Sequence, residues 1–160
     1  MSDIRYRAVW QATDTAAQIG AMTFWTDNAL LPPNANPMAR TAQLCVLAEA
    51  NGAVVGVSTA QVRSLEILRA RLALYRCAVA PEFRRRGVAT QLTVRSRQAL
   101  EAWSVAHPDQ QVQGMVCVVR GEALAAKRSQ PLWPLSGLGL IGYEASGEQI
   151  RVAWFDHSLV

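Results

Sequence analysis

The sequence predicts a mixed α/β (α+β) fold in which a central, mostly antiparallel sheet is flanked by helices. Segments typical of strands and helices follow one another in the order βαβββαβαββ. The pair Asn51-Gly52 joins two apolar, β-branched runs and is the strongest short-range signal for a hairpin. A further strand, ended by Pro81, leads through an arginine-rich loop into a helix. Together these features predict antiparallel strands first and a crossover connection later.

The first forty residues predict a strand, a helix and a loop. Residues 4–10 alternate as in a strand, and Thr15-Ala16-Ala17-Gln18 has the form of a capping box, so we expect a helix to begin there. Pro32-Pro33 ends this helix, and a Pro/Asn-rich loop continues to about Arg40. The apolar positions of the helix that fall near helical spacing are Ile19, Met22, Ala29 and Leu30.

The middle of the chain predicts three strands and a long helix. Residues 44–50 and 53–62 form the hairpin around Asn51-Gly52, and a third strand covers residues 71–79. The long helix opens directly after Gly87. Four apolar residues at helical spacing are expected on one face of it, namely Val88, Leu92, Ala99 and Trp103.

The last third predicts a strand over residues 112–119 and a short helix over residues 122–129. A final pair of strands, 140–145 and 149–155, is joined by the turn Ser146-Gly147. Between them and the short helix, Gly137-Leu138-Gly139-Leu140-Ile141-Gly142 has the glycine spacing of a dinucleotide-binding motif. It follows a proline-rich loop and opens no helix, so we expect a loop and turn instead.

A chain of 160 residues has the usual size of one domain and can bury a core without disulfide or metal staples. We therefore expect a single domain over residues 1–160. No stretch approaches the ~20 apolar residues needed to cross a bilayer, so no membrane partner is expected. The start of the chain lacks the apolar segment of a secretory signal, and we expect the protein in the cytoplasm.

The cysteines give no sign of a disulfide or metal site. Cys45, Cys77 and Cys117 each lie inside an apolar, strand-like run. An odd count at irregular spacing suits neither a disulfide framework nor a zinc site. A catalytic cysteine would need a nearby histidine, but His107 and His157 flank no motif. We predict three reduced, packed thiols and no metal.

The net charge of +4 is concentrated in one region. Residues 63–97 contain nine arginines against Glu66 and Glu82, a net of +7, so the rest of the chain carries −3. Such a region suits nucleic acid or a smaller polyanion, and a solvated charged surface is the plain alternative. The residues after Pro81 decide between them.

Arg84-Arg85-Arg86-Gly87 immediately precedes the long helix. The first N–H groups of a helix have no partner within it and carry partial positive charge, so a glycine-bearing loop at this point is a ready anion site. Gly87 permits close approach of the ligand. Guanidinium groups pair with phosphates in a forked geometry that lysine cannot copy. The pattern predicts a pyrophosphate ligand.

The run Val79-Ala80-Pro81-Glu82-Phe83-Arg84-Arg85-Arg86-Gly87-Val88-Ala89 resembles the signature of the GCN5-related N-acetyltransferase (GNAT) family. There, a strand ending in Val-x-Pro is followed by Arg/Gln-x-x-Gly-x-Gly/Ala at a helix start. The order of elements, Gly56 and Gly142-Tyr143 are similar too. A chance helix start is the alternative. The resemblance implies a GNAT-like fold and an acyl-CoA-dependent N-acyltransferase, with acetyl-CoA as co-substrate and no metal.

The resemblance also implies which residues bind the cofactor. Backbone groups of Cys77 and Val79 would pair with the pantetheine arm as an added strand, and an N–H there could stabilise the oxyanion formed from the thioester. Backbone N–H groups that would hold the pyrophosphate belong to Arg84, Arg85, Arg86, Gly87, Val88 and Ala89.

The catalytic acid and base are less well defined. The family usually places a tyrosine on the short helix after the fifth strand, where it protonates the departing thiolate. That position falls on Ser129, so Ser129 is the candidate acid, with an inert helix-end serine as the alternative. Tyr143 is expected in the core. Glu49 and Glu66 are possible bases by strand location alone, and the general base stays unassigned.

The predicted reaction is transfer of an acyl group from acyl-CoA to an amine by direct attack in a ternary complex. The acyl group expected is acetyl. The expected partner is a small-molecule or peptide amine; Trp25, Trp133 and the loop 31–37 either border its site or simply pack. A longer acyl donor and a catalytically silent acyl-CoA-binding module stay open as alternatives, as does a homodimer. Nucleic acid is not expected, because the arginines are not interleaved with aromatic residues.

Overall fold

The computed structural model describes residues 3–120 and 129–159. Within these ranges the helices are α1 (Thr15–Asp27), α2 (Pro37–Thr41) and α3 (Val88–Ala106). The strands are β1 (Arg5–Ala8), β2 (Leu44–Ala50), β3 (Ala53–Leu65), β4 (Ala70–Val79), β5 (Val112–Val119), β6 (Leu132–Trp133), β7 (Leu138–Tyr143) and β8 (Gln149–Trp154). The 3₁₀ helices are η1 (Glu66–Leu68), η2 (Pro81–Phe83), η3 (Pro108–Gln110) and η4 (Asp156–Ser158). The short helix predicted over 122–129 lies outside the described residues, apart from Ser129.

Hydrogen bonds join the strands of the described ranges in the order β1-β2-β3-β4-β5-β8-β7-β6. The pairs β1–β2, β2–β3, β5–β8, β6–β7 and β7–β8 are antiparallel. The pair β4–β5, whose strands are connected through α3, is parallel. The sheet is therefore mixed and mostly antiparallel, and the predicted fold class is confirmed.

The chain divides into two compact units, which are described separately below. The first contains residues 1–60 and 77–99, and the second contains residues 61–76 and 100–160. The elements β3, β4 and α3 contribute residues to both units. The expectation of one acyltransferase-like domain over residues 1–160 stays a prediction.

In the first unit, α1 is capped one residue earlier than the sequence predicted. Asp14 is the N-cap, and its carboxylate accepts a hydrogen bond from the Ala17 N–H at 2.9 Å. The predicted capping box from Thr15 to Gln18 is therefore wrong, because Thr15 is already helical. A carboxylate at this position also interacts favourably with the helix dipole.

The end of α1 does not depend on Pro32-Pro33. The Asn28 side-chain amide and backbone N–H both donate to the Phe24 carbonyl, at 2.8 and 3.2 Å. Ala29 then adopts a φ of 50°, which turns the chain out of the helix. The helix stops at Asp27 because its last turn is closed locally.

Helix α2 lies within the segment predicted as a loop, and that prediction is wrong over these residues. Asn36 caps it by accepting from the Met38 and Ala39 N–H groups, and Pro37 occupies the first helical turn. An Asn-Pro pair is a typical helix start, so the signal was present in the sequence.

The core of the first unit contains residues of α1 and of the strands β2 and β3. Ile19, predicted on the apolar face of α1, is 56% exposed, so that assignment is wrong. The side chains that α1 buries are Ala17, Ala21, Phe24 and Trp25. The burial of Trp25 favours the packing alternative for this residue over a role in a substrate pocket.

The hairpin between β2 and β3 forms as predicted. Asn51 and Gly52 both have positive φ, 52° and 77°, as a two-residue turn of type I′ requires. Ala50 pairs with Ala53 across the turn. The register shifts near the other end of the hairpin, between Leu44 and Val46.

At that irregularity, a buried polar cluster replaces regular sheet pairing. The Ser58 hydroxyl accepts from the Val46 N–H at 2.9 Å and lies 2.7 Å from the Ser96 hydroxyl of α3. Burial raises the pKa of the adjacent Cys45 thiol to about 12, and hydrogen bonds with Ser96 and Ser58 offset this only in part. Cys45 is therefore a protonated, packed thiol, as predicted.

Helix α3 buries a stripe that the apolar pattern predicted only in part. Val88 and Leu92 are buried as expected, but Ala99 and Trp103 are only half-buried. The stripe continues instead through Ser96, Leu100 and Ser104. Gly56 of β3 lies against Leu92, since a Cβ at this glycine would be 3.1 Å from the Leu92 Cδ1.

In the second unit, β8 pairs with β5 on one side and β7 on the other. Gly147 closes the predicted turn between β7 and β8 with a φ of 89°. The segment 137–142 opens no helix, which agrees with rejecting a dinucleotide-binding motif. It is not a loop, however, because β7 begins at Leu138; residues 132 and 133 provide a further strand, β6, as its partner.

The buried cluster around Ser58 generates a stability prediction. Ser58→Ala leaves the buried Val46 N–H without its acceptor, which is expected to lower the free energy of unfolding by about 1–3 kcal/mol. Ser64→Ala, on an exposed position of the same strand, is the control and should change it by less than about 0.5 kcal/mol. Chemical denaturation of the two variants measures both values, and equal effects would contradict the assigned role of the cluster.

Candidate functional site

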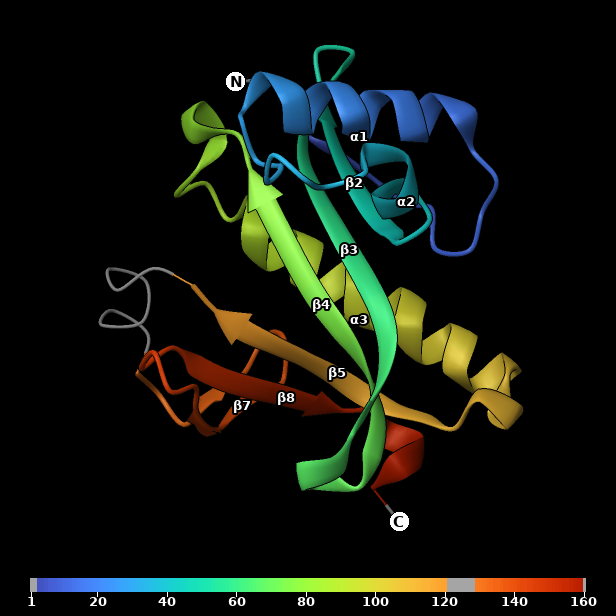
Figure 1. Cartoon of the computed structure of the whole chain (residues 1–160), viewed down its shortest axis with the longest axis vertical. Helices are drawn as coiled ribbons and strands as arrows, with labels where there is room; N and C mark the ends of the chain where they lie inside the picture. The colour runs from blue at the N-terminus through green and yellow to red at the C-terminus, as the bar shows by residue number, and fades with distance from the viewer. Residues whose placement is uncertain (1–2, 121–128, 160) are drawn as a thin grey trace. The chain divides into compact units, whose positions relative to one another are not determined.

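The loop between β4 and α3 is tied to the end of its strand. The Ala80 N–H donates to the Val55 carbonyl of β3 at 2.8 Å, and η2 follows at once. The Arg84 Nε–H then reaches back to the Val79 carbonyl at 3.0 Å. Figure 1 shows this passage from β4 through the loop into α3. The bond from Arg84 therefore fixes where the helix begins relative to the strand.

The backbone of this loop turns twice into the left-handed region. Arg85 has a φ of 60° and Gly87 a φ of 77°. Turns of this kind aim successive N–H groups into a shared concavity that suits anions. The Gln91 N–H donates to the Gly87 carbonyl at 3.0 Å, so Gly87 precedes the first turn of α3. The N–H groups of that first turn have no acceptor within an α-helix.

The side chains around this turn leave space and bring positive charge. Arg84, Arg85 and Arg86 are all exposed, and the Arg86 guanidinium stacks 5.4 Å above the Phe83 ring. A Cβ placed on Gly87 would meet nothing within 4 Å. The start of α3 is thus an open, cationic cradle of backbone donors, which fits a phosphate or pyrophosphate group.

The two other predicted cofactor positions, Cys77 and Val79, lie at the end of β4, a few residues before the arginine loop in the sequence. Val79 is buried, whereas Cys77 is exposed, so the prediction of three packed thiols is wrong for Cys77. The pairing of β4 with β5 extends from Arg71 to Leu74. In the described part of the chain, this ladder does not reach Cys77 or Val79.

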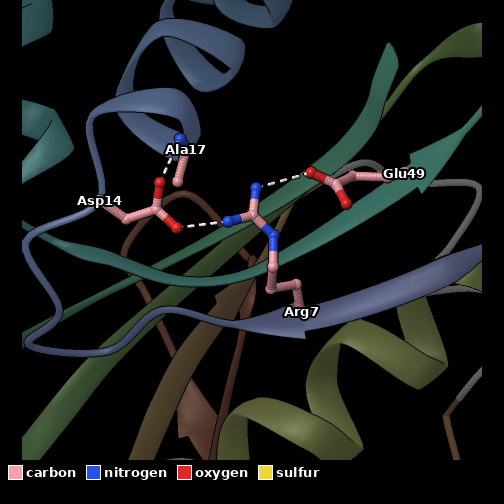
Figure 2. A network of polar contacts seen from close by, with 4 residues as sticks. All are labelled: Arg7, Asp14, Ala17 and Glu49. Atoms are coloured by element: carbon pink, nitrogen blue, oxygen red, sulfur yellow. Dashed lines mark hydrogen bonds and ion pairs between the residues drawn. The ribbon is translucent and has the colours of Figure 1, made fainter. Parts of the chain in front are cut away.

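Glu49, one of the possible bases, belongs to a polar network in the first unit (Figure 2). The Arg7 guanidinium donates to Glu49 at 2.8 Å and to the Asp14 carboxylate, which also caps α1. The hydrogen bond with Glu49 is the main reason that the pKa of Arg7 is raised. This pairing gives Glu49 a structural role that links β1, β2 and the start of α1.

Glu66, the other possible base, lines a groove of about 920 Å³ in the second unit. In this groove the Ser104 hydroxyl donates to the Val112 carbonyl at 2.6 Å and lies 2.9 Å from the His157 Nε2. None of residues 77–89 lines the groove. The general base therefore stays unassigned, and the groove is not assigned to the cofactor.

Ser129, Tyr143 and Trp133 belong to the second unit. Ser129 is exposed and belongs to no helix or strand. Tyr143 is 62% exposed, so its expected place in the core is wrong. Trp133 lies beneath the guanidinium of Arg151, 3.9 Å from its ring centroid. Arg151 was not predicted as a site residue, although an arginine inside the apolar strand 149–155 was a signal for a buried polar contact.

Among the described residues, no group of three His, Cys, Asp or Glu side chains could hold a metal ion. No helix in the described ranges is both long and apolar enough to cross a membrane.

Solved structures similar to this chain share its fold at low sequence identity. A GNAT-family acetyltransferase from Streptococcus pneumoniae has a TM-score of 0.58 at 10% identity, covering 95% of this chain and 99% of that chain. YncA from Salmonella typhimurium, solved with its cofactor acetyl-CoA, has a TM-score of 0.59 at 14% identity, covering 98% and 96%. Diaminobutyrate acetyltransferase EctA from Paenibacillus lautus, solved with its substrate and coenzyme A, has a TM-score of 0.52 at 16% identity, covering 97% and 96%.

Sequence comparison assigns the family. Residues 10–107, more than half of the chain, match the acetyltransferase (GNAT) family. No curated protein matches the sequence significantly. The chain therefore belongs to the GNAT family. The family resemblance noted at residues 79–89 is confirmed.

The geometry of Gly87 generates a binding prediction. Gly87→Glu places a carboxylate where the phosphate would bind and is expected to abolish detectable acetyl-CoA binding in calorimetry. Its φ of 77° means that any side chain also strains the loop, by roughly 1–2 kcal/mol.

Gly52→Glu is the matched control, because Gly52 has the same φ of 77° and equally open surroundings. It should lose similar stability but keep wild-type affinity. If a folded Gly87→Glu protein binds acetyl-CoA as tightly as Gly52→Glu does, residues 84–89 are not the cradle.

Proposed function

We propose that this chain transfers an acetyl group from acetyl-CoA to an amine by direct attack in a ternary complex. The observation that carries the proposal is the start of α3, which is entered through exposed arginines with Arg85 and Gly87 at positive φ. Family membership gives the same class of chemistry. No other loop of the described residues combines a helix start, three exposed arginines and a glycine with open space.

In this proposal, backbone N–H groups of Arg84, Arg85, Arg86, Gly87, Val88 and Ala89 hold the pyrophosphate. The guanidinium groups neutralise its charge, and Arg84 also keeps the loop against the strand end. Backbone groups of Cys77 and Val79 align the pantetheine arm along β4. An N–H group of this strand polarises the thioester carbonyl.

The lone pair of the neutral amine attacks the thioester carbonyl carbon, the C–N bond forms and the C–S bond breaks. The nitrogen gives up one proton, to a base that is not assigned, and the departing CoA thiolate takes up one. Ser129 is the proposed donor to the sulfur, and its hydroxyl regains a proton from solvent so that no alkoxide remains.

A small-molecule or peptide amine is the proposed acceptor. The structure of diaminobutyrate acetyltransferase contains a small diamine substrate, which supports an acceptor of this class. Two alternatives are retained: a longer acyl donor, and a silent acyl-CoA-binding module in which the exposed Ser129 has no catalytic role.

Thermal unfolding tests the ligand of the arginine loop. Acetyl-CoA should raise the melting temperature, because binding to the folded state alone adds stability by mass action, about 2.7 kcal/mol at a hundredfold excess over Kd. Duplex DNA at physiological salt should leave it unchanged. A shift with DNA and none with acetyl-CoA would overturn the proposal.

Release of free CoA thiol, measured against a panel of amines, amino acids and peptides, tests transfer itself. With an acceptor that turns over, Ser129→Ala should lower kcat while leaving acetyl-CoA affinity nearly unchanged, since the hydroxyl acts only as the thiolate leaves. Ser146→Ala, at an exposed turn serine, is the control and should leave kcat as in the wild type. An unchanged kcat in Ser129→Ala removes this residue from the mechanism, and no turnover on any acceptor favours the silent module.

A further inference from the structure

Arg151 is the largest fully buried side chain in the described residues, with no exposed surface. Three of its N–H groups reach neutral oxygens. Nε donates to the Gln149 side-chain oxygen at 2.9 Å, Nη1 to the Leu138 carbonyl at 3.2 Å and Nη2 to the Gln130 carbonyl at 2.7 Å. Arg151 therefore spans from its own strand to both ends of the segment 130–138.

That segment forms a small hairpin with the first residues of β7. Strand β6 pairs with the start of β7, the Gly137 N–H donates to the Trp133 carbonyl at 2.8 Å, and the Leu140 N–H donates to the Pro131 carbonyl at 2.8 Å. These bonds set its internal shape. The contacts with Arg151 attach its beginning, at Gln130, to strand β8, which lies between β5 and β7.

The chemistry of arginine is needed for this attachment. Burial lowers the pKa of the Arg151 guanidinium from its ordinary value, with Cys117 and Tyr143 acting in the opposite direction. The group nevertheless stays charged in a protein, so each buried N–H must have a partner. Its planar fork reaches carbonyls in different directions while one face stacks on Trp133 at 3.9 Å. A lysine cannot reproduce both contacts.

We propose that Arg151 is a positioning residue for the transferase reaction, which acts by fixing the Gln130 carbonyl and thereby the adjacent Ser129. The inference rests on the proposed function for the role of Ser129. Arg151 touches no reacting group. Arg151 orders the hairpin 130–138 and so holds the Ser129 hydroxyl beside the departing thiolate. The hydroxyl gives its proton to the thiolate and regains one from solvent. A serine on an exposed, irregular segment has no element of its own to hold it in place.

Hydrogen exchange tests the positioning directly, without any need for turnover. Arg151→Met should speed amide exchange in peptides from 130–138 at least about tenfold, because the buried attachment is lost. Arg71→Met is the matched control, since Arg71 also donates to a backbone carbonyl in this unit, that of Gln110 at 2.8 Å. It should leave exchange of 130–138 unchanged. Wild-type exchange in a folded Arg151→Met protein would overturn the proposal.

A double-mutant cycle on kcat tests the route through Ser129. Arg151→Met alone should lower kcat roughly ten- to a hundredfold, the order expected when a reacting group is displaced by about 1 Å. In the Ser129→Ala background it should have no further effect, and acetyl-CoA affinity should be that of the wild type throughout. Effects that multiply in the double variant would show that Arg151 does not act through Ser129.

Arg151→Lys is the second variant, and it replaces Arg151→Met in both experiments if Arg151→Met does not fold. It keeps the charge but not the fork, so it should move exchange and kcat in the same direction by a smaller factor, and no change in either would overturn the proposal. Failure of the proposed function is recognised separately. It would appear as no acetyl-CoA binding by the wild type, whereas the exchange of 130–138 would still decide whether Arg151 positions this hairpin.

Discussion

The left-handed backbone at Arg85 and Gly87 is the constraint on which the candidate site depends. It lets α3 begin almost directly after β4, and the space beside Gly87 is open. The N–H groups of a first helical turn have no acceptor within the helix, so this turn can offer them to a ligand. A left-handed conformation costs about 1–2 kcal/mol at a residue with a Cβ, and Arg85 adopts it nonetheless. The hydrogen bond from Arg84 to the Val79 carbonyl holds the loop in this shape.

Each compact unit also contains a buried polar arrangement that fixes an irregular part of the fold. In the first unit, Ser58 satisfies the Val46 N–H where the β2–β3 register shifts. In the second, Arg151 satisfies carbonyls of the hairpin that follows residue 129. Buried polar groups must be hydrogen-bonded, so both arrangements specify one conformation where an apolar core would tolerate several.

The three arginines of the cradle have different roles. Arg84 is partly used to hold the loop, and Arg86 is stacked on Phe83. The other arginines of the region 63–97 are not a uniform patch either, since Arg95 stacks 4.8 Å above the Tyr6 ring and Arg71 donates to the Gln110 carbonyl. At least four of the nine arginines in this region therefore make contacts within the protein.

The sequence alone determined the features that depend on neighbouring residues: the Asn51-Gly52 hairpin, the strand that ends at Val79 and the helix after Gly87, because turn chemistry and periodicity are local. The Asp14 cap is equally local, since its partner is the Ala17 N–H, but Thr15 offered a competing cap in the sequence. The sequence did not determine that Tyr143 is exposed or that Ile19 faces solvent. Those two outcomes depend on which surfaces meet in the folded chain. The contacts of Arg151 join residues 13 and 21 positions apart, and only the tertiary structure could decide them, because nothing in a sequence specifies which distant carbonyls a buried guanidinium will find.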